Sequence, residues 1–550
     1  MFEGIDDIAW ATLRHNYGTA ENIPGLLRAA ARGEPAANAN DSLDNLLLHQ
    51  GGWVCPAATA ALPFLLDLIE APGAADRIEH VELIAFLARE AAGVDPAYID
   101  DGWGRAWSAA FPRVAKLLDD PAEDVRRSAA WALGHSRHEA PAAIAGLRGR
   151  FAREPAAIVR ADLLDALEEL GDGEWIAALR DDRDPTVAVN AVLKTHARNG
   201  STVDTAELAA VLTALGGMDE PEIHRPILAA ESPALTPADY LAVVGVLAEH
   251  PEPSRRLAAI GLANLLLAEH RDLDARLISL LTPLMDGPDT RRKALGVLAA
   301  VAAPLPGLYA NHLGDPAAGV ADAALWALVR TGDARCVPVL CEAIATGERH
   351  TRGHDSLPHV WSLPSLGELA ELVPGAFVPE VLTAVRARLA AGPHSARLDY
   401  LHTLVAWGTR ASAAGPEVEA LVGTDADHMA RQALDAIAPS TPSPPEAAEL
   451  SDPDSWRRTR AAHRLWRATG EVTVAARILV PVVEEALDGP RALPVGRAAI
   501  AHLAEMGAAE AKPIARRVLA EDRRLRYFGG WRVFTEDEAW RRAAERILEA

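Results

Sequence analysis

Apolar residues recur at helical spacing after an Asp-Pro turn near residue 120. Four of them fall on one face of a helix: Val125, Ala129, Ala132 and Leu133. Asp120 is a good N-cap, and Pro121 suits the first helical position because proline has no amide hydrogen to donate. Gly134 follows the last apolar residue and predicts the end of the helix. Residues 111–118 have the pattern of a preceding helix, so this region predicts a helical pair.

The same pattern returns further along the chain in the same register. The turn Asp315-Pro316 is followed by Val320 and then by a second Trp-Ala-Leu sequence at residues 326–328. Weaker copies recur at spacings of 34 to 36 residues, as three pairs of arginines show: Arg126 and Arg160, Arg256 and Arg292, Arg397 and Arg431. Self-similarity at this period indicates helical hairpins that stack and bury their apolar faces against their neighbours.

These segments resemble HEAT repeats, including the variety called PBS-lyase-like HEAT repeats. The resemblance implies an all-α, armadillo-type fold: a right-handed α-solenoid of stacked antiparallel helical pairs, with about a dozen to fifteen pairs of ~35–45 residues. It also implies that a turn Asp and the following Arg bridge adjacent repeats: Asp120 with Arg126, and Asp452 with Arg457. Ala321 follows Val320 where an arginine would stand, so we expect no bridge there.

The opening of the chain, from Trp10 to Leu66, is similar to the start of many uncharacterised bacterial HEAT-repeat proteins, and we expect it to cap the first apolar face. Residues 439–445 are rich in Pro and Ser and indicate a semi-rigid linker. We predict six parts: a capping module (1–70), HEAT-like repeats (71–345), an irregular insertion (346–379), further repeats (380–438), a linker (439–450) and C-terminal repeats that are less acidic (451–550).

Charge is spread unevenly along the 550 residues, whose net charge is −23. Residues 451–550 hold 18 Lys and Arg against 15 Asp and Glu, which leaves a net charge of −26 on the first 450 residues. A strongly acidic body repels phosphate backbones and attracts basic partners. We therefore expect a basic protein or peptide partner and do not expect nucleic acid.

The cysteine content and the hydropathy pattern bear on the compartment. Three cysteines are too few for a disulfide framework, which suits a reducing environment. The longest uncharged stretch, residues 294–314, is interrupted by Pro304 and Pro306 and makes a poor membrane span. We therefore expect a cytoplasmic protein with no membrane segment, and the sequence indicates no oligomeric state.

The irregular stretch 346–379 gathers polar and aromatic candidates within twelve residues: His350, His354, Asp355, His359 and Trp361. Histidines four apart on a helix can share a metal ion, with a carboxylate as third ligand. Gly353 and Pro358 argue against a continuous helix, so an ordinary surface loop is the simpler interpretation. Long loops in compact arrays are often functional. We therefore keep these residues as candidate partner-binding residues and assign no metal.

The tryptophans fall into two groups. Trp131 and Trp326 occupy matching repeat positions, which predicts that both pack in the core between repeats. Three others lie closer to the N-terminus, in Gly-rich surroundings: Trp53, Trp103 and Trp107. An exposed Trp is a candidate anchor for a partner. The equal alternative is that these three form an aromatic lid over the N-terminal cap.

Arginine and aromatic residues alternate in two runs near the C-terminus. The first run contains a candidate basic patch: Arg457, Arg460, Arg464 and Arg467. The second run spans residues 523–532. Such runs can grip phosphates and stack on bases, as in HEAT-like DNA glycosylases. The alternative, which the acidic remainder of the chain favours, is that arginine stems cover apolar helix faces and the runs dock within the molecule.

The sequence contains no Gly-rich phosphate loop, paired-Cys zinc site or nucleophile elbow. We therefore predict no cofactor and no catalytic residue. The leading hypothesis is a non-catalytic scaffold, a regulatory or adaptor protein whose acidic concave surface holds a basic protein or peptide. The alternative is an enzyme on the same scaffold, either a base-processing enzyme similar to DNA glycosylases or a metal-dependent one that uses the His350–His359 loop.

Overall fold

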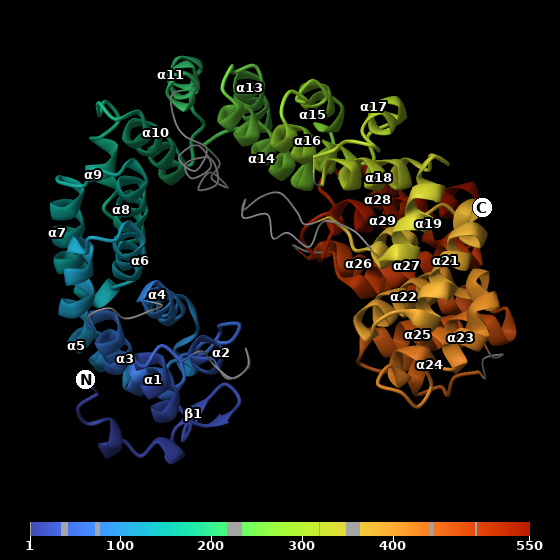
Figure 1. Cartoon of the computed structure of the whole chain (residues 1–550), viewed down its shortest axis with the longest axis horizontal. Helices are drawn as coiled ribbons and strands as arrows, with labels where there is room; N and C mark the ends of the chain where they lie inside the picture. The colour runs from blue at the N-terminus through green and yellow to red at the C-terminus, as the bar shows by residue number, and fades with distance from the viewer. Residues whose placement is uncertain are drawn as a thin grey trace. The chain divides into compact units, whose positions relative to one another are not determined.

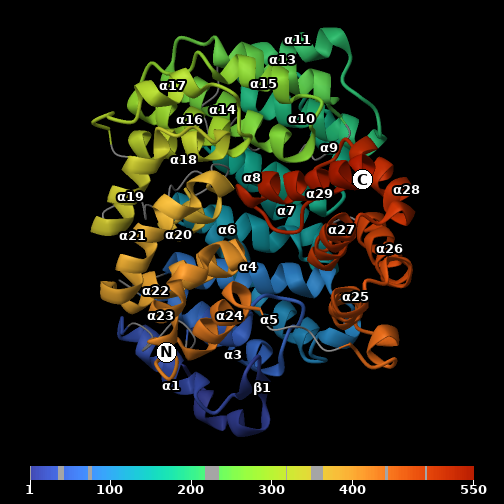
Figure 2. The ribbon, with the colours of Figure 1, turned by 90° about the vertical axis from the view of Figure 1, so that its right-hand side faces the viewer.

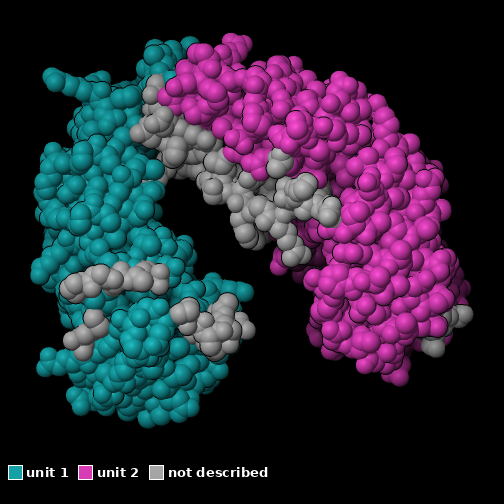
Figure 3. Space-filling view, viewed as in Figure 1, with its two compact units in different colours: residues 1–236 teal, residues 237–550 magenta. Residues whose placement is uncertain are grey.

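The computed structural model describes residues 2–34, 42–71, 77–216, 234–317, 319–347, 363–439, 444–489 and 492–550. These residues form helices and the connections between them, with one short hairpin in which β1 (Arg14–His15) pairs antiparallel with β2 (Gly18–Thr19). The chain divides into two compact units, residues 1–236 and 237–550, which we call unit 1 and unit 2 (Figure 3). The predicted all-α solenoid class is confirmed.

Unit 1 begins with short 3-10 helices and the hairpin, and helical pairs then stack one behind another (Figure 1). Its α-helices are α1 (Ile23–Ala31), α2 (Leu43–Leu47), α3 (Pro56–Glu70), α4 (Arg77–Gly93), α5 (Trp103–Lys116), α6 (Glu123–Gly134), α7 (Ala140–Phe151), α8 (Ala157–Glu169), α9 (Gly173–Ala177), α10 (Pro185–Asn199) and α11 (Thr205–Leu215). The second helices of successive pairs pack in the order α4, α6, α8 and α10. Leu and Ala side chains fill the space between these layers.

The strongest sequence repeat forms α6 with one change at its start. The helix begins at Glu123 and its N-cap is Ala122, whereas Asp120 accepts a hydrogen bond from the Ala122 amide at 2.9 Å in the turn before it. Asp120 therefore organises the turn, and the prediction that it is the N-cap is wrong. Gly134 ends α6 as predicted. A Cβ at this position would lie 2.9 Å from the Ala166 Cα of α8, so glycine allows the two helices to approach closely.

Arginines near the starts of second helices bridge successive repeats, usually to a carboxylate in the turn of the next repeat. The ion pairs are Arg77–Asp120 at 2.5 Å, Arg126–Glu154 at 2.9 Å, Arg160–Asp184 at 2.8 Å and, in unit 2, Arg291–Asp315 at 3.1 Å. Arg126 also donates to the carbonyl oxygens of Asp120 and Pro121 at 3.0 and 3.1 Å. One guanidinium thus holds its own turn and the following repeat together. We call this series the arginine ladder.

The ladder refines the bridge that the HEAT resemblance implies. Arg126 contacts the backbone of Asp120, while the Asp120 carboxylate pairs with an arginine of the preceding repeat. Asp452 pairs with Arg457 at 3.5 Å, but the neighbouring Arg458 makes the turn contact, donating to the Asp452 carbonyl at 2.7 Å. In this repeat the turn-holding arginine is therefore one residue later than the resemblance implies.

Unit 2 is also built of stacked helical pairs (Figure 1). Its α-helices are α13 (Pro237–Ala248), α14 (Pro253–Glu269), α15 (Asp274–Leu281), α16 (Pro288–Ala300), α17 (Pro306–Asn311), α18 (Val320–Thr331), α19 (Cys336–Thr346), α20 (Leu366–Glu371), α21 (Val378–Ala391), α22 (His394–Trp407), α23 (Gly415–Glu419), α24 (Asp427–Ile437), α25 (Ser455–Thr469), α26 (Val472–Asp488), α27 (Pro494–Met506), α28 (Lys512–Ala520) and α29 (Arg532–Glu549). The last five helices surround a core of their own.

The C-terminal end of unit 2 returns to the first helices of the same unit. Arg524 pairs with Asp274 at 2.6 Å and with Asp537 at 3.2 Å. The ring of Trp531 meets that of Trp326 edge-on, with centroids 6.1 Å apart. The second arginine run therefore docks within the molecule, as the packing interpretation predicts. Residues 451–550 belong to the same compact unit as 237–438, so the units divide near residue 236 and not at the Pro-rich segment 439–450.

Candidate functional site

A groove runs across the second helices α4, α6 and α8 of unit 1. These helices lie side by side, on the opposite side from α5 and α7 (Figures 1 and 2). The groove has a volume of about 660 Å³. Its polar and aromatic lining comprises Glu82 from α4, Asp124, Arg127, Ser128, Trp131 and the adjoining His135 from α6, and Asp162, Asp165 and Glu169 from α8. The helical spacing that buries one face of each helix places these polar residues on the other face.

Carboxylates dominate the charge of this groove, with five against one guanidinium. Arg127 pairs with Asp162 at 2.8 Å and Asp165 pairs with Lys194 of α10 at 2.6 Å, so these two acids are compensated from within unit 1. Glu82 and Glu169 are exposed, and their carboxylates form no ion pair or hydrogen bond in the described part of the chain. The groove therefore offers uncompensated negative charge on its two outer helices, α4 and α8.

Trp131 and His135 line the groove beside these acids. Trp131 is half-buried, and its ring meets that of Phe86 edge-on at 4.7 Å, while the Arg89 guanidinium lies 5.7 Å from the Trp131 ring. The Nε2 atom of His135 is buried and has no hydrogen-bond partner in the described structure. Burial lowers the pKa of His135, and Glu169 opposes this shift. The imidazole is therefore neutral at pH 7 and leaves the groove negatively charged.

A second hollow of about 460 Å³ adjoins the first at His135. Trp103 and Trp107 form part of its wall, together with Asp100, Asp101 and Glu139. The acidic lining thus continues beyond α6 towards the start of α5.

Trp103 and Trp107 are not exposed anchors. Only 6% and 5% of their surfaces are exposed, their rings stack with centroids 5.8 Å apart, and the Trp107 indole donates to the Ser136 hydroxyl at 3.2 Å. Trp53 is half-buried against the N-terminal core. The prediction of exposed tryptophans is wrong for Trp103 and Trp107, because both rings are buried and stack on each other. The residues His350, His354, Asp355, His359 and Trp361 lie outside the described residues.

Most of the candidate basic patch on α25 has acidic partners. Arg457 pairs with Asp452 at 3.5 Å, Arg464 pairs with Glu449, and Arg467 pairs with Glu505 at 3.6 Å. Arg460 is exposed. Because three of the four guanidinium groups already contact carboxylates, their arrangement favours packing within unit 2 over the binding of phosphates.

The sequence reasoning missed Trp131 and His135 as site residues. Trp131 shares its repeat position with Trp326, and the sequence predicts both in the core; this is confirmed for Trp326, which is 1% exposed, and wrong for Trp131, which is half-buried. The available signal was the helical spacing of three acidic residues on α8: Asp162, Asp165 and Glu169 are three and four residues apart and so share one face of the helix. These acids lie on the face that the apolar pattern leaves free.

Comparison with known proteins agrees with the repeats. Residues 62–168, which include most of the groove-forming helices, match the family of HEAT repeats, and no curated protein matches the chain. Residues 62–168 therefore match HEAT repeats, and the stacked helical pairs of the described structure agree with this match. In the described part of the chain, no helix is long and apolar enough to cross a membrane.

Among solved structures, the chain is similar to three karyopherins. A crystal structure of importin β is 15% identical, with a TM-score of 0.35, and the match covers 89% of this chain and 63% of that chain. Yeast importin-β (Kap95p) is 13% identical, with a TM-score of 0.31 and coverages of 96% and 62%. Kap121p is 11% identical, with a TM-score of 0.31 and coverages of 97% and 62%. The chain thus spans less than two thirds of the length of these proteins.

Proposed function

We propose that the groove across α4, α6 and α8 binds a basic segment of a partner protein, and that the protein acts as a non-catalytic scaffold or adaptor. The observation that supports this proposal is the groove's excess of carboxylates, above all the exposed Glu82 and Glu169 without partners. Opposite charges attract weakly in water and more strongly near a protein surface, so a lysine or arginine would gain most at these two positions.

The spacing of the helices sets the length of segment that fits. Packed helices lie about 8–10 Å apart, so three of them span roughly 20 Å from the first axis to the last. An extended chain covers about 3.3 Å per residue, so a segment of roughly six residues would cross the groove. We expect basic residues near both ends of that segment, one facing Glu82 and the other facing Glu169.

Trp131 would contribute between these ends. Its half-buried ring lies among carboxylates on the floor of the groove. A guanidinium or ammonium group over an exposed aromatic face gains about 0.5–1 kcal/mol. The groove would therefore prefer an arginine-containing segment to a lysine-only segment, because guanidinium groups also stack on aromatic rings.

The proposal is tested by fluorescence anisotropy of labelled hexapeptides on the full chain at about 150 mM salt, where non-specific attraction is screened. Reversing both free charges (E82K/E169K) is expected to weaken binding of an Arg-containing peptide about tenfold or more, since each lost contact contributes about 1 kcal/mol. The matched control reverses two exposed acids elsewhere, Glu174 on α9 and Glu342 on α19, with the same change in net charge.

The control variant E174K/E342K is expected to bind within about twofold of the wild type. Equal losses in both variants would show that net charge alone attracts the peptide and would contradict the proposal. So would equal binding of an acidic hexapeptide by the wild type. A W131A variant that keeps the preference for arginine would remove the role of the ring while leaving that of the carboxylates.

A further inference from the structure

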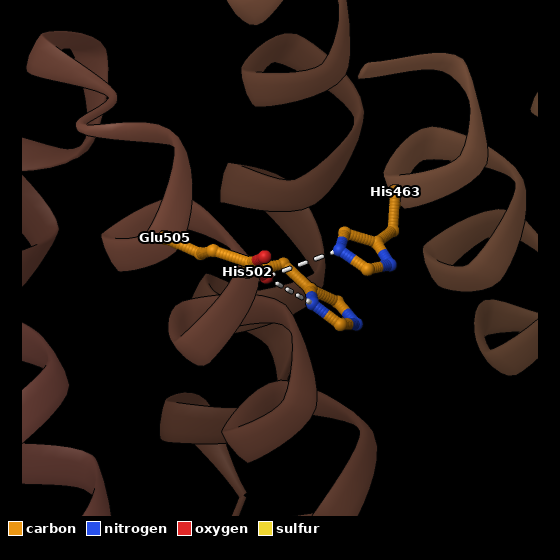
Figure 4. Close-up of side chains that lie close together, drawn as sticks. All are labelled: His463, His502 and Glu505. Atoms are coloured by element: carbon orange, nitrogen blue, oxygen red, sulfur yellow. Dashed lines mark hydrogen bonds and ion pairs between the residues drawn. The ribbon is translucent and has the colours of Figure 1, made fainter. Parts of the chain in front are cut away.

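Three potential metal ligands meet between two helices of unit 2. His463 comes from α25, and His502 and Glu505 come from α27 (Figure 4). One nitrogen of each imidazole and one carboxylate oxygen lie within 4.8 Å of one another. Helices α25 and α27 both pack against α26 and contact each other. His502 and Glu505 are three residues apart, so they share one face of α27.

Glu505 lies beside the stacked pair of imidazoles (Figure 4). Its Oε2 atom lies 3.1 Å from Nε2 of His463 and 3.9 Å from Nδ1 of His502. The two rings stack almost in parallel, with centroids 3.8 Å apart and planes 14° apart. One carboxylate oxygen therefore faces a nitrogen atom from each histidine, and the three atoms form the corners of a small triangle (Figure 4).

We propose that His463, His502 and Glu505 bind a divalent transition-metal ion of the zinc class. Two imidazole nitrogens and one carboxylate oxygen are the ligand set of three-residue zinc sites, in which a fourth ligand completes a tetrahedron. Nitrogen ligands favour Zn²⁺ and its neighbours over Mg²⁺ and Ca²⁺, which prefer all-oxygen sites. Glu505 is exposed, so the fourth position opens towards solvent.

Two neighbouring side chains contact the proposed ligands and would help to orient them. The Arg467 guanidinium lies 3.6 Å from Oε1 of Glu505, which leaves Oε2 to the imidazoles. The Trp466 ring stacks on His463 with centroids 5.6 Å apart and limits the rotation of the imidazole. Outer groups that orient a ligand in this way raise metal affinity.

The simpler alternative is that Glu505 accepts a hydrogen bond from one histidine and that the three residues bind no metal ion. The two alternatives differ in whether zinc binds and in which residues it needs.

The test titrates Zn²⁺ into the full chain, after treatment with a chelator, in competition with a chromophoric zinc indicator at pH 7.4. The wild type is expected to bind one equivalent that H502A and E505Q lose, with affinity reduced at least 10–100-fold, as for other essential metal-site groups. Bound Co²⁺ should give the visible absorption of a four-coordinate site in the wild type and lose it in both variants. H402A, which removes an exposed histidine of α22, is the matched control and should leave both readouts unchanged.

Several outcomes would overturn the site. Absence of a stoichiometric zinc equivalent in the wild type would do so, as would equal binding by wild type, H502A and E505Q. Loss of the equivalent in an H350A/H354A/H359A variant, with retention in H502A, would assign the ion elsewhere. Because Glu505 is exposed, E505Q is expected to keep the wild-type circular dichroism and melting temperature, so its loss of metal would not reflect unfolding.

Discussion

The carboxyl group of Glu371, at the end of α20, lies where its charged form is disfavoured. Burial raises its pKa to about 7, and the nearby carboxylates of Glu368 and Asp399 add to the shift, while Arg532 opposes it. Glu368 and Asp399 are both occupied, since Glu368 pairs with Arg532 and Asp399 accepts from the Ser365 hydroxyl at 2.9 Å. Of these three carboxyl groups, Glu371 is therefore the one whose ionisation is disfavoured.

This shift predicts a stability change with pH. The folded-state pKa of about 7 exceeds the ordinary value of 4.5, so the folded state binds more protons between these values. Protonated Glu371 therefore contributes to the free energy of unfolding in full below pH 4.5, and this contribution is lost as the pH rises through 7. E371Q stays neutral, so at pH 8 we expect it to be more stable than the wild type by about 1–3 kcal/mol, and similar at pH 4. Urea unfolding at both pH values measures this, with E342Q as an exposed control; a difference that does not change with pH would contradict it.

At this scale, the sequence pattern predicted which face of a helix a residue occupies, but not what covers that face. Trp131 and Trp326 share one repeat position, yet Trp326 is 1% exposed and Trp131 is half-buried. The difference comes from Trp531, which returns from about 200 residues away to pack on Trp326. Helical periodicity carries no information on such long-range contacts, so the core role of Trp326 could be predicted and the groove role of Trp131 could not.

Helix α29 holds the C-terminal end of unit 2 against its beginning through buried charge. Asp537 is 1% exposed and contacts Arg524 at 3.2 Å, Arg541 at 2.9 Å and Arg271 at 3.3 Å. Arg330 of α18 also pairs with Glu538 of α29. One carboxylate therefore contacts three guanidinium groups: Arg541 of α29, Arg524 of the segment before α29, and Arg271 of the connection between α14 and α15.

Removing that carboxylate should weaken the closure of unit 2. D537A leaves the buried Arg541 without a counter-charge, which typically destabilises a protein by about 3–5 kcal/mol. The free energy of unfolding, measured in urea, is expected to fall by this amount. The control is E545A, an exposed acid of the same helix, which should change stability by less than about 0.5 kcal/mol. Equal effects of the two variants would mean that the buried cluster does not hold α29.

At the scale of elements, the proposed metal site could not be predicted from the sequence, because its ligands come from two helices that are not consecutive in the chain. The ligands of the proposed metal site come from α25 and α27, and α26 separates these helices in the chain. The sequence shows a single His-x-x-Glu at 502–505, which is too common to indicate a site by itself. The packing of two helices on α26 brings His463 to it.

At the scale of the whole molecule, the buried core of unit 1 is separate from the core that the last five helices of unit 2 form, which is the basis of separate cooperative unfolding. We expect two transitions in differential scanning calorimetry. R126A, which leaves the buried Glu154 without this partner, should lower the melting temperature of unit 1 alone, and D537A that of unit 2 alone. A single transition that both variants shift equally would contradict this prediction.

The repeat architecture could be predicted because each pair satisfies the same local rules of turn, apolar face and small residues. The division near residue 236 could not, because it depends on contacts between segments far apart in the chain. The Pro-rich segment 439–445 marks a change in composition, but α24 and α25 on either side of it belong to one compact unit.

The arginine ladder has a consequence for how an array of this kind can grow or shrink. Each rung joins an arginine of one module to a carboxylate in the turn of the module after it, and equivalent groups recur in successive modules. If one complete module were deleted or duplicated, each arginine that lost its partner would therefore lie next to the equivalent carboxylate of another module. A deletion of part of a module would leave a buried charge without its partner. The ion pairs of the ladder therefore allow the array to change length only by whole modules.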